Sequence, residues 1–197
     1  MKLYCATTNS GKLREFRLIV NRFGGGRIEV ESLDNIKQIE PPEETGATFE
    51  ENAALKAVYY SQFAPGPLFA DDSGLAVDAL DGAPGIYSAR FAGEHAGDAA
   101  NNQLLFEKLK GAENRKARFV CAISLAQAGS VTGVWRGEVE GRIIDDLRGS
   151  EGFGYDPLFY FEPFGATFGQ VTAERKLLVS HRSKALELMI AQLLALQ

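Results

Sequence analysis

The order of elements at the start of the chain is the feature that most constrains its fold. Lys2 to Thr8 is short, apolar and rich in β-forming residues, and it stops at Asn9-Ser10-Gly11. A helix is predicted from about Lys12 to Phe23, where apolar residues recur at helical spacing, and Gly24 to Gly26 ends it. Arg27 to Glu31 alternates like a second strand. A strand–turn–helix–strand opening predicts an α/β fold.

A long hairpin later in the chain indicates that the sheet is mixed. Ala117 to Gln127 alternates cleanly, Ala128-Gly129-Ser130 turns the chain, and Val131 to Ile144 returns as a partner strand. Antiparallel strands added to a parallel opening predict a long mixed β-sheet flanked by helices. The other predicted elements are helices over Thr48–Ala64, Asp98–Lys110 and Thr172–Val179, a strand over Leu158–Phe161 and a final helix from Ser180 whose Ala185, Leu188, Met189 and Leu193 are expected to be buried.

The composition is that of an ordinary globular protein with one domain, or one domain with two lobes. Its 197 residues can bury a real core, and 45% of them are hydrophobic and 24% charged. The net charge of −5 argues against a nucleic-acid partner. No apolar run reaches ~18 residues, so we expect no membrane partner and a cytoplasmic location. Cys5 and Cys121 lie in apolar runs and are expected to be reduced core thiols.

The centre of the chain carries two adjacent acids between apolar runs. Pro67 to Ala70 leads into Asp71 and Asp72, followed by Ser73-Gly74 and the apolar Leu75 to Val77. We predict that a strand delivers the acids into a Gly-containing turn, because sites are commonly built at strand ends. The alternative is an ordinary surface turn, since Asp, Ser and Gly are turn formers.

The first turn of the chain has features of a phosphate-binding turn. A helix N-terminus offers unpaired N–H groups, while Thr7, Thr8, Asn9 and Ser10 add small donors and Lys12 adds a charge. A Walker A loop is rejected, because it needs Gly where Ala6 stands and a hydroxyl where Leu13 stands. A phosphate-binding turn of another kind and an ordinary βα turn are both left open.

Three further segments allow either a site or a structural interpretation. Asn52 and Lys56 lie one helical turn apart, and Lys56 either snorkels at the edge of an apolar face or points into a site. The glycines of Gly152-Phe153-Gly154-Tyr155-Asp156-Pro157 free a ring to stack on a flat base, or form a turn with a buried Phe. His181 and Arg182 oppose the helix dipole in the first turn of the last helix, a local violation that indicates function.

Together these segments resemble one known family. The matching motifs, in chain order, are Thr7-x-Asn9-x-x-Lys12, Phe49-x-Glu51-Asn52-Ala53-x-x-Lys56, Ala70-Asp71-Asp72-Ser73-Gly74-Leu75, Gly82-Ala83-Pro84-Gly85-Ile86-Tyr87-Ser88-Ala89-Arg90, Gly152-Phe153-Gly154-Tyr155-Asp156-Pro157 and Ser180-His181-Arg182. From Lys2 to about Leu194 the chain closely resembles the inosine/xanthosine triphosphate pyrophosphatases. The resemblance implies a single two-lobed α/β domain over residues 1–197, a central substrate cleft between the lobes, and a homodimer.

The resemblance also implies a reaction and a metal. The expected activity is hydrolysis of ITP, dITP and XTP to the monophosphate and pyrophosphate with Mg²⁺, which removes deaminated purines from the nucleotide pool. Asp72 is implied as metal ligand and as acceptor of the proton from the attacking water, and Asp71 as its support. Glu43 is implied as the second metal carboxylate, with the adjacent Glu44 as the alternative. Lys12, Lys56 and the Thr7–Gly11 turn, which includes Thr8, Asn9 and Ser10, are implied to balance the triphosphate charge.

Base selection is implied for residues in the last third of the chain. Arg182 is a donor and His181 can donate, so both suit the keto oxygen of hypoxanthine or xanthine and leave adenine mismatched. Guanine shares that oxygen, so these two residues do not exclude it. Phe153 is implied to stack on the base. Further implied substrate contacts are Asn52, Ser73, Gly154, Tyr155, Asp156 and Lys176.

Two other functions remain as alternatives. An aspartyl phosphatase also places acids after an apolar strand, but it usually needs Asp-x-Asp and would release orthophosphate through a covalent intermediate. A nucleotide sensor would bind without turnover. The paired acids favour turnover.

Overall fold

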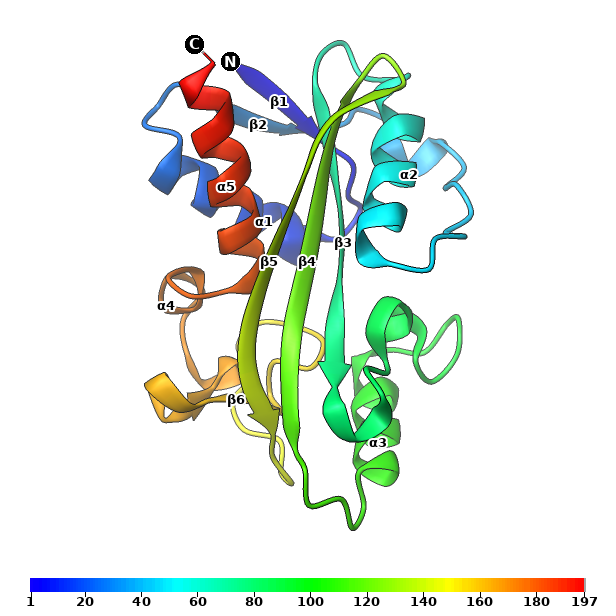
Figure 1. Ribbon diagram of the computed structural model, residues 1–197, viewed down its shortest axis with the longest axis vertical. Coiled ribbons are helices and arrows are strands. Elements are labelled where there is room, and N and C mark those ends of the chain that lie inside the picture. Colours follow the sequence, from blue (N-terminus) through cyan, green and yellow to red (C-terminus); the bar gives the residue numbers. More distant parts are fainter. Residues whose placement is uncertain (197) are drawn as a thin grey trace. The chain divides into compact units, whose positions relative to one another are not determined.

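The computed structural model describes residues 1–196, which form a mixed sheet flanked by helices (Figure 1). The sheet order is β2-β1-β3-β4-β5-β6-β7, with β1 parallel to β2 and β3, and β6 antiparallel to β5 and β7. The strands are β1 (Lys2–Cys5), β2 (Glu29–Ser32), β3 (Leu68–Val77), β4 (Lys116–Gln127), β5 (Ser130–Ile143), β6 (Phe159–Phe161) and β7 (Ala166–Thr167). The α/β class and the mixed sheet are therefore confirmed.

Each predicted helix is present in the structure, and its bounds lie close to the predicted ones. The α-helices are α1 (Ser10–Phe23), α2 (Phe49–Ser61), α3 (Asp98–Lys108), α4 (Ala173–Leu177) and α5 (His181–Ala195). Short 3-10 helices cover η1 (Ile36–Gln38), η2 (Asp78–Leu80), η3 (Gly85–Arg90), η4 (Glu162–Phe164) and η5 (Phe168–Gln170). Within residues 1–196, no helix is both long and apolar enough to cross a membrane.

The described residues cluster into two compact units. The first contains residues 1–72, 121–137 and the chain from His181 onward, and the second contains residues 73–120 and 138–180. Strands β3, β4 and β5 each contribute residues to both units. That the chain acts as one two-lobed domain with a central cleft stays a prediction.

Helices α1 and α2 of the first unit begin at side-chain caps. Asn9 Oδ1 accepts a hydrogen bond from Lys12 N at 3.0 Å, so α1 starts slightly earlier than predicted. Thr48 Oγ1 accepts from Glu51 N at 3.1 Å, which is one half of a capping box. The Glu51 carboxylate instead accepts from Ala47 N at 2.7 Å. Both helices thus begin where short polar side chains satisfy their first N–H groups.

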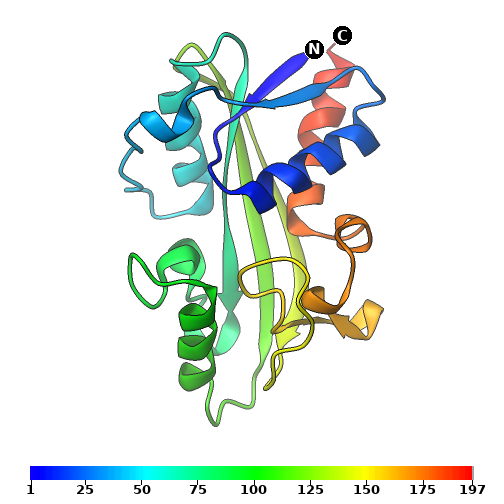
Figure 2. The same cartoon turned by 180° about the vertical axis from the view of Figure 1, so that it is seen from behind.

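Helix α5 runs beside α1 and packs on β5 (Figures 1 and 2). A Cβ at Gly137 of β5 would overlap the His181 carbonyl oxygen and stand 2.6 Å from Ala185 N, so only glycine allows this approach. Ala185 and Met189 are buried as predicted. The prediction was wrong for Leu188, which is 52% exposed, because the buried face is offset and takes Leu186 and Ile190 instead.

The core of the second unit contains a group of aromatic rings. Phe119 of β4 and Phe159 of β6 have ring centroids 4.6 Å apart, and Phe168 lies 5.1 Å from Phe159. Helix α3 covers this core through the fully buried Leu105. Gly97 is the N-cap residue of α3, and no side chain caps this helix.

Strand β3 corrects the prediction for the central acids. Asp71 and Asp72 were expected at a strand end before a turn, yet β3 continues from Leu68 to Val77 and contains both of them. Lysines bind both carboxylates, and these partners allow charged residues inside a buried strand. Gly74 serves a close approach, since a Cβ there would overlap Ser88 Oγ and the Gly85 carbonyl oxygen. Cys5 and Cys121 are buried free thiols, as expected.

Candidate active site

Asp71 is held as an anion by cations from two helices. Successive strand residues point to opposite faces of a sheet, and Asp71 faces α1 and α5. Its Oδ2 lies 2.8 Å from Lys12 Nζ and 3.8 Å from Arg182 Nε, and the residue is 4% exposed. Burial alone would raise the pKa of this carboxyl, but Lys12, and then Arg182, more than offset it, and the pKa falls to about 2.

Asp72 faces α2, and its pKa is shifted in the opposite direction to that of Asp71. Its Oδ1 accepts from Lys56 Nζ at 2.7 Å, while its buried Oδ2 has no hydrogen-bond partner among residues 1–196. Burial raises the pKa of Asp72, and Lys56 only partly offsets that effect. A carboxylate with a raised pKa and an oxygen not engaged by the protein can accept a proton or bind a metal ion.

Lys56 points into the site and does not snorkel. Its side chain is 14% exposed, and its Nζ lies between Asp72 Oδ1 and Glu44 Oε1, the latter at 2.9 Å. Burial alone would lower the pKa of Lys56, but Asp72, Asp71 and Glu44 raise it above its usual value. The residue is therefore a fixed positive charge beside Asp72.

The loop before α2 brings Glu44 to this cluster. Gly46 N donates to Asn52 Oδ1 at 2.8 Å, and a Cβ at Gly46 would stand 2.6 Å from that oxygen. This bond ties the loop to α2 and leaves Glu44 on Lys56. Glu43 is exposed, and its implied role as a metal ligand stays a prediction. Of the two adjacent acids, Glu44 is therefore the one that contacts Lys56.

The turn between β1 and α1 is ordered by its own side chains. Thr7 Oγ1 accepts from Asn9 N at 3.2 Å, and Asn9 in turn caps α1 at Lys12. Thr8 and Ser10 are exposed, and Gly11 is half-buried. The turn thus presents exposed small polar groups next to the lysine that binds Asp71, an arrangement that suits an anion.

Arg182 is buried between two carboxylates from different elements. Its Nη1 pairs with Glu15 Oε2 of α1, and its Nε faces Asp71. Burial would lower the pKa of Arg182, but Glu15 and Asp71 raise it, so the guanidinium stays charged. The adjacent His181 is buried as well. The sequence analysis did not identify Glu15, although its position one helical turn from Lys12 places both residues on one face of α1.

Residues Gly152 to Pro157, the glycine-rich loop, form a separate cluster with Lys176 within the second unit. Asp156 Oδ2 accepts from Phe153 N at 3.0 Å and from Lys176 Nζ at 2.6 Å. That Nζ also lies 5.1 Å from the centroid of the Phe153 ring. Asp156 and Lys176 are almost fully buried, whereas Phe153 is half-buried. Tyr155 is the buried ring of the loop, and its hydroxyl donates to the Ser88 carbonyl at 2.8 Å.

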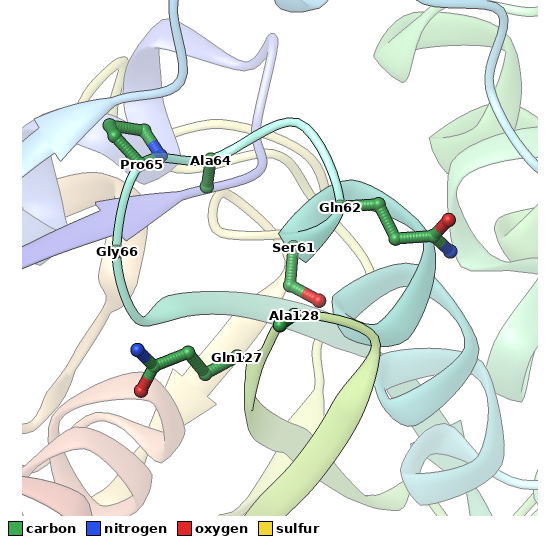
Figure 3. Close-up of a pocket in the computed structure, with 7 residues that line it drawn as sticks. All are labelled: Ser61, Gln62, Ala64, Pro65, Gly66, Gln127 and Ala128. Atoms are coloured by element: carbon green, nitrogen blue, oxygen red, sulfur yellow. The ribbon is translucent and has the colours of Figure 1, made fainter.

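The predicted residues thus fall into two groups. The first unit brings together Lys12, Lys56, Asp71, Asp72 and Arg182, and the second brings together Phe153, Asp156 and Lys176. Ser73 follows Asp72 on β3 and is half-buried. A pocket of about 410 Å³ at the end of α2 (Figure 3) is lined by small or polar residues without an ionisable side chain, so it offers no charge to balance a polyphosphate.

Fold and charge define the class of protein: a mixed-sheet α/β protein with a lysine–carboxylate site beside a polar βα turn. The chain belongs to the Ham1 family, whose model matches residues 3–192. It is 49% identical to a dITP/XTP pyrophosphatase of Exiguobacterium sibiricum over 98% of this chain and 97% of the relative. It is 48% identical to a dITP/XTP pyrophosphatase of Listeria monocytogenes over 94% of this chain and 91% of the relative. The solved Staphylococcus aureus Ham1 protein matches it with a TM-score of 0.87 and 40% identity, covering 100% of both chains.

Proposed function

We propose that this protein hydrolyses the deaminated purine nucleoside triphosphates ITP, dITP and XTP to the monophosphate and pyrophosphate. The observation that carries the proposal is Asp72, a buried carboxylate with a raised pKa, a lysine on Oδ1 and no hydrogen-bond partner for Oδ2 among residues 1–196. The names of the relatives supply the substrate class. Such an enzyme removes deaminated purines from the nucleotide pool.

The charges of the first unit support phosphate binding. Two unit charges ~4 Å apart repel by about 4 kcal/mol at an effective dielectric of 20, so a triphosphate beside Asp71 and Asp72 needs compensation. In the proposal, Lys12 and Lys56 supply part of it, together with the Thr7–Gly11 turn. Asp72 takes the proton from a water that attacks the α-phosphorus, and pyrophosphate leaves.

The carboxylates of the site suit Mg²⁺. Mg²⁺ is usually held by one or two carboxylates and completes its shell with water and substrate oxygens. Within residues 1–196 no group of three or more His, Cys, Asp or Glu side chains could hold a metal ion. In the proposal, Asp72 and Glu43 hold the ion, and Glu44, whose Oε1 lies 2.9 Å from Lys56 Nζ, is the alternative to Glu43. When bound, Mg²⁺ would supply positive charge that offsets the repulsion between phosphates and carboxylates.

Base recognition is proposed for the Gly152–Pro157 loop and for His181 and Arg182. Phe153 stacks on the purine, and Gly154, Tyr155 and Asp156 shape the loop that carries it. His181 and Arg182 donate to the keto oxygen, where adenine presents a donor and is disfavoured. Lys176, Ser73 and Asn52 are further substrate contacts in this proposal. The ion pairs of Arg182 with Glu15 and Asp71 support it, because they fix the direction of the guanidinium.

The assembly and location are inferred from the family resemblance. We infer a homodimer in the cytoplasm, with the purine nucleotide as the substrate. Sedimentation of the purified protein tests the first inference, because a dimer has twice the mass of the 21.4 kDa chain.

The proposed function is tested by the products formed from ITP, XTP, GTP and ATP, each with and without Mg²⁺. We expect magnesium-dependent pyrophosphate from ITP and XTP, little from GTP and ATP, and loss of turnover in Asp72→Asn. The exposed Asp34→Asn is the matched control and should behave like the wild type. Orthophosphate as the product would indicate the phosphatase, and ITP binding without turnover would indicate the sensor.

A further inference from the structure

Helix α3 holds the residue next to Phe153 by both of its backbone groups. Asp98 Oδ2 accepts a hydrogen bond from Gly154 N at 2.6 Å, and Asn102 Nδ2 donates to Gly154 O at 3.1 Å. Asp98 and Asn102 are four residues apart, so they lie on the same face of α3. The donor–acceptor match is complete: a carboxylate takes the N–H and an amide NH₂ takes the carbonyl.

The neighbouring Asn101 makes the same kind of contact with another segment. Its Oδ1 accepts from Ala92 N at 2.8 Å, and its Nδ2 donates to Ala89 O at 3.2 Å. This segment continues from Ser88, whose carbonyl accepts from the Tyr155 hydroxyl. Asn101 and Asn102 are buried. The start of α3 therefore contacts the glycine-rich loop directly at Gly154. It also contacts the loop indirectly, because the segment that Asn101 holds continues from Ser88, which accepts a hydrogen bond from Tyr155.

These contacts matter because the loop has little stiffness of its own. Gly152 and Gly154 flank Phe153 with φ of 75° and 63°, conformations that glycine adopts at little cost and leaves easily. Asp156 fixes Phe153 N on one side, and the α3 contacts fix Gly154 on the other. The half-buried ring of Phe153 is thus the part that these anchors orient.

We propose that Asp98 and Asn102 are positioning residues for purine binding, because they hold Gly154 so that the Phe153 ring faces the base. The proposal deepens the proposed function and rests on the role of Phe153 given there. A ring that is fixed before the ligand arrives loses less freedom on binding. The hydrogen bonds of Asp98 and Asn102 to Gly154 should therefore increase nucleotide affinity and leave the hydrolytic step almost unchanged.

Matched substitutions separate the hydrogen bonds from the general presence of polar side chains. Asp98→Ala and Asn102→Asp each remove one bond, the second by replacing the only suitable donor with an isosteric acceptor. Asp98→Asn keeps an acceptor for Gly154 N and serves as the rescue. Gln103→Ala is the control on the same helix, because Gln103 is exposed and its amide donates to Glu107 Oε1 at 3.1 Å within that helix.

The dissociation constant of IMP is the main measurement, because IMP carries the base and is not turned over. Asp98→Ala and Asn102→Asp should raise it about tenfold and leave kcat for ITP within about threefold, whereas Asp98→Asn and Gln103→Ala should stay near the wild type. In a Phe153→Ala background the same substitutions should have no further effect on IMP affinity. Thermal unfolding without ligand checks that each variant is folded at the assay temperature.

Wild-type IMP affinity in both Asp98→Ala and Asn102→Asp, or an undiminished effect in the Phe153→Ala background, would overturn the proposal. If Asn102→Asp fails to fold, Asp98→Ala and its rescue by Asp98→Asn decide the outcome. Absence of pyrophosphate from ITP in the wild type would refute the proposed function, and the IMP titrations would still test the positioning role of Asp98 and Asn102.

Discussion

Burial raises the pKa of both adjacent carboxyls, Asp71 and Asp72, but their charged partners leave the two pKa values shifted in opposite directions. Asp71 meets Lys12 and Arg182, and its pKa falls to about 2. Asp72 meets Lys56 and is also close to Glu44, and its pKa is raised. The folded protein thus favours the anion at Asp71 and disfavours it at Asp72. Asp71 is suited to balancing charge, and Asp72 to accepting a proton.

The neutral isosteres Asp71→Asn and Asp72→Asn should therefore differ in their effects: the first lowers stability, and the second abolishes turnover with little change in stability. Asp71→Asn leaves Lys12 and Arg182 with one negative charge fewer, and we expect a loss of about 3 kcal/mol in the free energy of unfolding. Asp72→Asn removes a carboxylate that the fold disfavours, so stability should change by less than about 1 kcal/mol while turnover is abolished. Urea unfolding at pH 7 measures the free energy of unfolding of both variants. Equal losses of stability in the two variants would contradict this assignment.

The buried thiols give the protein a pH dependence at alkaline pH. Burial raises the pKa of Cys5 to about 12 and raises that of Cys121 as well. Above about pH 9 the unfolded chain releases these protons and the folded chain keeps them. The free energy of unfolding should therefore fall between about pH 9 and 12, by up to ~1.4 kcal/mol per pH unit for each thiol. Urea unfolding of the wild type and of a Cys5→Ala/Cys121→Ala variant should show different slopes, and identical slopes would refute the effect.

At the scale of elements, the packing of α5 on β5 depends on one missing side chain. Gly137→Ala would push a Cβ into the backbone of His181 and Ala185, and we expect a loss of about 1–3 kcal/mol in the free energy of unfolding. Gly133→Ala on the same strand is the control, since its nearest atoms belong to the half-exposed Trp135 ring, which can move. Chemical denaturation of both variants gives the comparison. A larger loss in Gly133→Ala would show that the backbone contact is unimportant.

The sequence predicted elements with strong periodicity and recognisable ends. α1, α2 and the β4–β5 hairpin follow from helical spacing, caps and turn residues. The prediction failed at β3, because Asp71-Asp72-Ser73-Gly74 has the local propensity of a turn. Contacts with Lys12 and Lys56, remote in sequence, override that propensity. No local pattern reveals them.

The same limit applies to the candidate site. Motif spacing identified Lys56, Asp72 and Phe153, which the structure places in polar clusters. It did not identify Glu15, the partner of Arg182, or Asp98, which accepts a hydrogen bond from Gly154. Such partners lie far apart in the chain and are brought together only by the fold.

At the scale of the whole molecule, continuous strands connect the two compact units. β3, β4 and β5 each contribute residues to both units, so neither unit unfolds without disrupting strands that also belong to the other. We expect a single cooperative transition, with equal calorimetric and van't Hoff enthalpies. Two resolved transitions would indicate separate domains and contradict the single-domain prediction.

The position at which water attacks is the central claim, and isotope labelling tests it most directly. The protein is incubated with ITP and Mg²⁺ in H₂¹⁸O, and the two products are analysed by mass spectrometry. Attack at the α-phosphorus, with Asp72 as proton acceptor, predicts one ¹⁸O atom in IMP and none in pyrophosphate. Label in pyrophosphate would place the attack at the β-phosphorus and contradict the proposed chemistry.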